Sequence, residues 1–180
     1  MKGVINKGIQ ELIEGRFGAD AWAEIKSRAQ CAEPFFAISE DYPDELTVAL
    51  AGAASETLGI PVDTLLVEFG KFWVPNTGRD SYPTFYQLAG KTAREFLLNM
   101  NRVHEQVTRN APSATPPVFT YEEVPDGTLC MHYHSQRGLC PVLRGLILGV
   151  GELFEEPLEV VETACAREGA PHCVMEVRFQ

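Results

Sequence analysis

The chain of 180 residues is long enough for one domain with a buried core and barely long enough for two. Its 15 Lys and Arg residues stand against 25 Asp and Glu, and the net charge of −10 argues against an extended basic face for nucleic acid or an anionic membrane. Hydrophobic residues at 45% and charged residues at 22% are ordinary for a globular domain. We expect a soluble acidic domain that binds a small molecule or another protein.

The sequence shows no targeting or membrane-spanning segment. Residues 1–7 lack the continuous apolar core of a signal peptide, and the longest apolar run, residues 146–150, is far too short to cross a bilayer. The five cysteines are an odd number, and without a secretory signal they indicate reduced thiols in a cytosol. We therefore expect a cytoplasmic protein.

The first half of the chain has helical patterns. Apolar residues recur at spacings of three and four from residue 4 to residue 13, and Gly15 and Gly18 follow near the expected stop. The longest pattern runs from 91 to about 110 and ends before a Pro-rich segment. Residues 74–78 are expected to form a loop, and 82–89 one or two helical turns. Further helices are expected at residues 19–29, 45–58 and 62–71.

The second half changes to strand patterns. Residues 118–124 and 129–135 are expected to pair through a turn at Pro125, Asp126 and Gly127. A helix over 141–154 and strands over 158–165 and 172–179 complete a β-β-α-β-β order. The sequence therefore predicts an α+β fold with a four-stranded antiparallel sheet in one domain, residues 1–180, with a mainly helical part (1–110) and a sheet-containing part (118–180).

A row of polar side chains follows the second predicted strand. If the strand continues past 135, Tyr133, Ser135 and Arg137 lie on one face at intervals of roughly 6–7 Å. The Arg guanidinium grips a carboxylate or a phosphate with two hydrogen bonds. The row therefore suits a ligand with two anionic arms, although the polar face of a solvated strand is an alternative reading.

His104 lies on the apolar stripe of the long helical pattern, with Leu97, Met100, Val103 and Val107. A buried imidazole needs a partner, because polar nitrogens without one are costly in an apolar setting. One reading is a structural His bonded to a backbone carbonyl; the other is an axial metal ligand. A haem accounts for both His104 and the polar row, because it is a large apolar disc with two carboxylate arms and one axial His ligand.

With these residues, the sequence resembles the H-NOX family, the haem nitric oxide and oxygen binding domains that include the sensor of soluble guanylate cyclase. The match spans nearly the whole chain, and its most specific motif is Tyr-x-Ser-x-Arg at 133–137. The resemblance implies haem b between the helical and sheet parts, with His104 as proximal ligand and the motif residues on the propionates. Residues implied to contact the haem are Pro117, thirteen residues after His104, and Ile5, Ile9, Leu97 and Met100.

The residue opposite the proximal His decides which gas is bound. Oxygen-binding members have a distal Tyr that donates to O₂, whereas nine residues beyond Tyr133 this chain has Val142. The resemblance therefore implies a haem that binds NO and CO but little or no O₂. Trp73 matches a position near the distal pocket, although a buried core Trp is the alternative. Three residues stay open as substitute donors: Tyr82, Tyr86 and Tyr121.

Three cysteines, Cys140, Cys165 and Cys173, are expected to approach one another around the last hairpin. With a fourth donor, Glu162 or His172, they suit a closed tetrahedral zinc site. Some bacterial members of the family carry structural zinc in a similar pattern, with a His where this chain has Glu162. Thiols that form a disulfide on oxidation are an alternative, and free buried cysteines are another.

We expect a stand-alone, non-enzymatic NO sensor of bacterial type. NO would weaken the iron bond of His104 until it breaks, and release of strain against Pro117 and Ile5 would shift the helical part relative to the sheet. No output domain fits in 180 residues, so the signal would pass to a separate protein, in this family a histidine kinase or a cyclic-di-GMP enzyme. A thiol or zinc redox sensor is the main rival; a haem enzyme is disfavoured because no distal acid–base pair can be placed.

Overall fold

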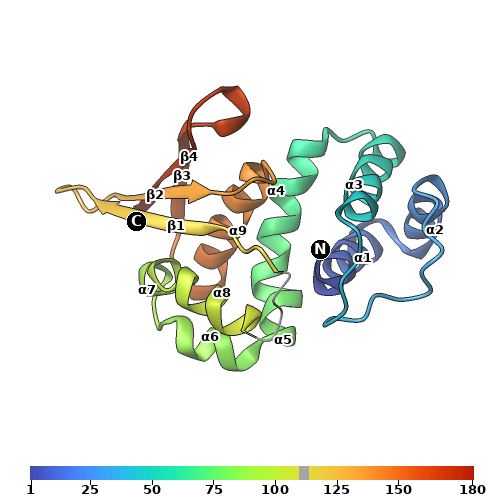
Figure 1. The fold of residues 1–180 in the computed structure, drawn as a ribbon, viewed down its shortest axis with the longest axis horizontal. Helices are drawn as coiled ribbons and strands as arrows, with labels where there is room; N and C mark the ends of the chain where they lie inside the picture. The colour runs from blue at the N-terminus through green and yellow to red at the C-terminus, as the bar shows by residue number, and fades with distance from the viewer. Residues whose placement is uncertain (110–113) are drawn as a thin grey trace.

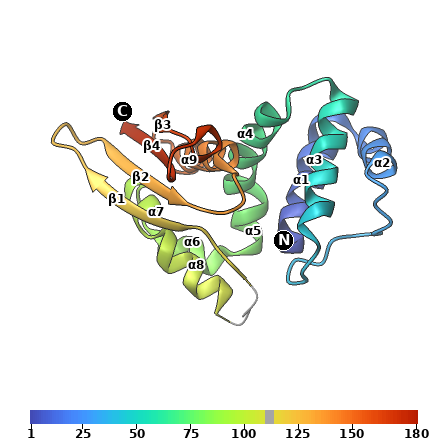
Figure 2. The ribbon, with the colours of Figure 1, turned by 45° about the horizontal axis from the view of Figure 1, so that its top comes forward.

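Helices from the first half of the chain flank a four-stranded antiparallel sheet with one long helix against it (Figures 1 and 2). The computed structural model describes residues 1–109 and 114–180. The predicted α+β class is confirmed. The elements are α1 Gly3–Phe17, α2 Ala19–Arg28, α3 Asp44–Leu58, α4 Val62–Trp73, η1 Val74–Gly78, α5 Arg79–Ser81, α6 Pro83–Ala89, α7 Ala93–Leu98, α8 Met100–Thr108, β1 Val118–Glu123, β2 Leu129–His134, α9 Cys140–Phe154, β3 Leu158–Ala164, η2 Ala166–Glu168 and β4 Cys173–Phe179.

The first four helices begin and end within two residues of the predicted bounds. Gly18, with φ of +88°, separates α1 from α2, a backbone conformation that suits glycine. Gly59, at φ of +64°, ends α3 in the left-handed region. Apolar periodicity and glycine stops therefore located these helices correctly.

The loop predicted at residues 74–78 is wrong, because η1 continues α4 as a π-helix. Pro75 has no N–H for the usual bond to the carbonyl four residues earlier, and a wider turn keeps the chain helical despite that loss. The Asn76 side chain donates to the carbonyl of Phe72 at 2.8 Å. The Phe72 carbonyl therefore accepts from the side chain of the residue whose backbone N–H would donate to it in an α-helix.

The long helix expected from 91 to 110 is divided at Asn99 into α7 and α8. Asn99 leaves helical geometry with φ of −91° and ψ of 4°, and its side chain donates to the carbonyls of Ala89 at 2.8 Å and Glu95 at 3.0 Å. A side chain that bonds locally to the backbone competes with the helical ladder. The predicted end of the helix near 110, with residues 111–113 beyond it, lies outside the described residues.

The sheet has the order β1-β2-β4-β3, with every neighbouring pair antiparallel. Phe119 pairs with Tyr133 across β1 and β2, and Tyr133 pairs with Cys173 across β2 and β4. Asp126 accepts from the amide of Thr128 at 2.9 Å in the turn between β1 and β2. Both hairpins occur where the sequence predicted them.

Two hydrophobic cores meet at α4, one among α1–α4 and one among the sheet, α7 and α9. Trp73 packs against both of them. Figure 1 shows α4 between the N-terminal helices and α9. Close approach of α4 and α9 depends on glycine, because a Cβ on Gly145 would lie 2.1 Å from the carbonyl oxygen of Val67, and one on Gly70 would lie 2.4 Å from that of Val142.

Within the described residues, no single helix is long and apolar enough to span a membrane. The segments Asp44–Leu58 and Val62–Ser81 pass that test only as a pair, and they are bent by 110° at their junction.

We predict that Gly145→Ala lowers the free energy of unfolding by about 2–3 kcal/mol, because the methyl group would overlap backbone that cannot move without separating the helices. Gly52→Ala is the matched control: it lies inside α3 with no atom within 4 Å of its Cβ position, and a gain of up to about 1 kcal/mol is expected. Urea unfolding followed by circular dichroism measures both. Equal stability of the Gly145→Ala and wild-type proteins would show that the contact does not constrain the fold.

Candidate functional site

A cavity of about 280 Å³ lies between the two cores, close to the lower end of the roughly 300–1,000 Å³ range of ligand pockets. Its walls come from α1, α4, α6–α9, β1 and β2. Most of the lining is apolar, and the polar groups are few. The aliphatic and aromatic lining includes Ile5, Phe69, Val74, Phe96, Leu97, Met100, Val103, Val107, Phe119, Met131, Val142, Leu143, Leu146, Ile147 and Val150.

His104 lines this cavity from α8 and stacks on Phe119, with ring centroids 5.9 Å apart. Burial lowers the pKa of His104, and a hydrogen bond to the backbone of Pro117 opposes that effect. Proline has no N–H, so the backbone group of Pro117 that acts on the imidazole is its carbonyl. Nδ1 of His104 is buried and has no partner within the described part of the chain.

This pattern separates the two readings of His104. A purely structural His would leave no nitrogen bare, because a buried polar atom without a partner is costly. A metal-ligating His typically donates one ring N–H to a carbonyl and keeps the other nitrogen as a lone-pair donor. A neutral imidazole with one unpaired nitrogen, in an apolar cavity, fits a haem ligand.

Tyr133, Ser135 and Arg137 all line the cavity, but not as one strand face. β2 ends at His134, so the alternation predicted for Ser135 and Arg137 is wrong. Residues 135–139 form a turn in which the Ser135 hydroxyl accepts from the amide of Arg137 at 3.3 Å, and Gly138 has φ of +62°. Burial raises the pKa of Tyr133, whereas a hydrogen bond with Ser135 lowers it.

The Arg137 guanidinium is held by two groups at one end of the cavity. Its Nε donates to Asp44 at 2.9 Å, and its Nη1 donates to the carbonyl of Thr115 at 2.8 Å. The other Asp44 oxygen accepts from the amine of Met1 at 2.7 Å. These hydrogen bonds, from Met1 first and then Arg137, lower the pKa of Asp44. A carboxylate ligand at Arg137 would therefore meet Asp44 as a competitor.

On other walls of the cavity lie two polar groups whose hydrogen-bond partners the sequence could not predict. Trp73 Nε1 and the Tyr86 hydroxyl are buried without a partner among the described residues, and both side chains line the cavity. A Cβ on Gly78 would lie 2.4 Å from each of these two side chains, so they converge there. Tyr121 is excluded as a free donor, because its hydroxyl donates to the carbonyl of Leu97 at 2.7 Å.

Of the remaining predicted contact residues, Ile5, Leu97, Met100, Pro117 and Val142 line the cavity. Ile9 is not among the lining residues. It is buried in the core of α1–α4, because only the first turn of α1 reaches the cavity.

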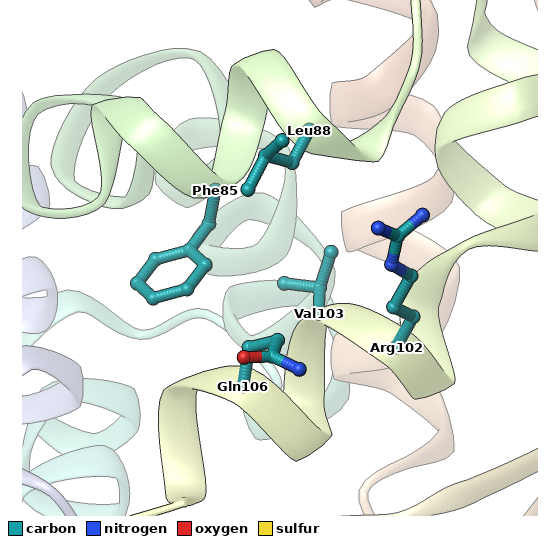
Figure 3. Close-up of a pocket in the computed structure, with 5 residues that line it drawn as sticks. All are labelled: Phe85, Leu88, Arg102, Val103 and Gln106. Atoms are coloured by element: carbon teal, nitrogen blue, oxygen red, sulfur yellow. The ribbon is translucent and has the colours of Figure 1, made fainter.

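A second pocket, of about 200 Å³, lies between α6 and α8. Figure 3 shows side chains of the two helices facing each other across it. Phe85 and Val103 line both this pocket and the larger cavity, so they separate the two spaces. The lining residues are Phe85, Leu88, Arg102, Val103 and Gln106.

The three predicted thiols converge with Glu162 into one cluster, whose four ligand atoms lie within 4.8 Å of one another. The Sγ atoms of Cys140 and Cys165 are 3.6 Å apart, so the thiols are free. Burial raises the pKa of both Cys140 and Cys173, which disfavours thiolates unless a cation neutralises them. His172, the alternative fourth donor, lies outside the cluster.

The family model described as haem-NO-binding matches residues 2–162. The chain is 26% identical over 182 residues to soluble guanylate cyclase gcy-31 of Caenorhabditis elegans, covering 99% of this chain and 26% of that protein. An H-NOX protein from S. oneidensis in its Fe(II)NO state superposes with a TM-score of 0.91 at 19% identity, over 100% of this chain and 99% of that one. For an I5F mutant of T. Tengcongensis H-NOX the TM-score is 0.87 at 26% identity, over 100% and 98%. The chain spans about a quarter of the length of the curated relatives it matches.

Proposed function

Because the chain belongs to the haem-NO-binding family, we propose that it is a gas-sensing domain that binds NO and CO at ferrous haem b, with little or no binding of O₂. The observation that carries this proposal is His104, whose buried Nδ1 has no partner in the described residues while the side chain lines an apolar cavity. A haem would offer a metal ion to the imidazole and an apolar surface to the walls of the cavity.

Residues at the two ends of the cavity would bind different parts of the haem. His104 supplies the axial nitrogen. Tyr133, Ser135 and Arg137 supply donors and one positive charge for the carboxylate arms. Arg137 is already fixed by the Thr115 carbonyl, so little side-chain freedom is lost when it turns from Asp44 to a carboxylate arm.

Haem would supply a ferrous iron that takes up NO and CO, and His104 would hold that iron through its imidazole. On release from the iron, His104 would be free to move and would stay close to the Pro117 backbone, in the segment before β1. α8, which carries His104, thereby changes its position relative to the sheet. The change is a shift between two conformations that NO binds unequally.

Selectivity for NO over O₂ rests on the absence of a hydrogen-bond donor at Val142. Bound O₂ gains much from such a donor, whereas NO binds ferrous iron without one. Trp73 Nε1 and the Tyr86 hydroxyl are buried without a partner among the described residues and could act in place of Val142, as could Tyr82, which also lines the cavity. We assign them to packing, and the experiment below tests that assignment.

The signal passes from this domain to a separate protein, such as a histidine kinase or a cyclic-di-GMP enzyme, and the domain itself has no catalytic role. The relatives named guanylate cyclases are about four times as long as the part that this chain matches.

We predict that the purified, reduced protein is coloured and that its absorption spectrum shifts under CO and under NO but not under air. Under NO the spectrum should be that of a haem that has lost its protein ligand, since His104 is released. Absorption spectroscopy in an anaerobic cuvette measures all three conditions.

Trp73→Phe and Tyr86→Phe serve as matched variants that remove one donor each and keep the aromatic ring. A colourless protein would contradict haem binding, and a spectrum under NO that retains the His ligand would contradict release. A stable O₂ complex that either variant abolishes would overturn the selectivity and identify the donor.

A second candidate function is a structural zinc ion or a redox switch at Cys140, Glu162, Cys165 and Cys173, favoured by the convergence of their four ligand atoms. Three thiolates and one carboxylate would complete a closed tetrahedral site and tie the start of α9 to β3 and β4.

We predict about one zinc ion per chain in the purified protein, measured by elemental analysis, and its loss in Cys165→Ser/Cys173→Ser. Cys31→Ser is the control, because Cys31 lies outside the cluster. A zinc content of the double variant equal to that of the wild type would contradict the site. Formation of a disulfide under mild oxidant without any bound zinc would favour the redox switch instead.

A further inference from the structure

Three of the four histidines in the chain gather at one place on the sheet, outside the cavity and the thiol cluster. His132 and His134 lie on β2, on either side of Tyr133. Because Tyr133 and Met131 face the cavity, the alternation of a strand directs His132 and His134 to the opposite face. His172 comes directly before β4.

The antiparallel register explains why these side chains meet. Tyr133 pairs with Cys173, and continuing the register by one residue brings His134 opposite His172, with His132 on the diagonal. The ring centroids of His134 and His172 are 4.4 Å apart, and those of His132 and His172 are 5.1 Å apart. Two strands thus present three imidazoles at cross-strand spacing.

One pair already has near-ligand geometry. His132 Nδ1 and His172 Nε2 are 2.9 Å apart, which is a hydrogen bond between two rings. Two nitrogens bound to one tetrahedral zinc ion at about 2.0–2.1 Å lie about 3.3–3.4 Å apart. To admit an ion, the two nitrogens need to separate by a few tenths of an ångström, and the rings need to tilt so that both lone pairs point at the ion and not at each other.

A nearby carboxylate and access from solvent both favour a bound ion at this pair. On the far side of the ring, His132 Nε2 lies 4.0 Å from a carboxylate oxygen of Glu122 on β1. A carboxylate behind a ligating His fixes its tautomer and increases its basicity. His134 is exposed and His132 partly exposed, so an ion can enter from solvent.

We propose that His132 and His172 form a surface site for a divalent late transition-metal ion of the zinc class, completed by water, with the ring of His134 packed beside that of His172. Imidazole nitrogen is a favoured donor for zinc, copper and nickel. A bound ion links β2 to the start of β4 directly behind the Tyr133–Cys173 pair. This pair joins the strand that lines the cavity to the strand that carries a thiol of the cluster, so the ion would stiffen the connection between them. The site is independent of the proposed gas-sensing function.

The test is a calorimetric titration of the purified, chelator-treated protein, with its haem, by ZnCl₂. We expect His132→Gln/His172→Gln to remove one class of Zn²⁺ binding that Cys165→Ser/Cys173→Ser retains. Glu122→Gln should weaken that binding about tenfold. Glu159→Gln, which removes a carboxylate that pairs with Arg178 on the same sheet, should leave it unchanged.

Zn²⁺ binding by His132→Gln/His172→Gln with the stoichiometry and affinity of the wild type would overturn the proposal. Complete loss of binding in a folded Cys165→Ser/Cys173→Ser protein would do so as well, because it assigns all the zinc to the thiols. If that variant does not fold, the comparison of wild type with the histidine variant decides alone: the histidine variant must take up fewer ions.

Discussion

A buried imidazole without a full set of partners is the constraint on which the site depends. The Pro117 backbone acts on the pKa of His104, and the enclosed Nδ1 of this ring has no partner within the residues that the structure describes. A single unpaired nitrogen in an apolar cavity costs about 1–3 kcal/mol, which is a substantial part of the stability of a small domain. At His104 this cost coincides with an apolar cavity that the imidazole lines, and the donors near Tyr133 and the guanidinium of Arg137 line the same cavity. Together these features indicate a binding site.

The cavity also lies where the two cores meet, so ligand binding and domain geometry are physically coupled. α4 packs on α9 through glycines that admit no Cβ, which makes that contact close and stiff. α8 has no fully buried residue and borders the outer pocket through Val103. Movement driven from His104 is therefore expected in α8, on the less constrained side of the cavity, while α4 and α9 hold the other side.

Sequence patterns predicted the fold class, the H-NOX resemblance and the identity of most cavity residues, because hydrophobic period and glycine stops act locally. Predictions from these patterns were wrong where a single side chain alters the helical hydrogen bonds of the backbone. Asn99 divides the long helix by bonding to the Ala89 carbonyl, and Pro75 is accommodated by a π-helical turn. Partners far apart in sequence were also missed: Asp44 lies 93 residues from Arg137, and no local signal connects them. The histidine cluster could be recognised only from the β2–β4 register, which brings His172 beside His132 and His134, while Cys173, the next residue, belongs to the thiol cluster.

If His104 provides the bond from the chain to the haem iron, exogenous imidazole should replace it. We expect His104→Gly protein to have an altered ferrous absorption spectrum, and added imidazole to restore the spectrum of the wild type, since the free ring occupies the space that the side chain left. A ferrous spectrum of His104→Gly identical to that of the wild type without imidazole would contradict this role of His104.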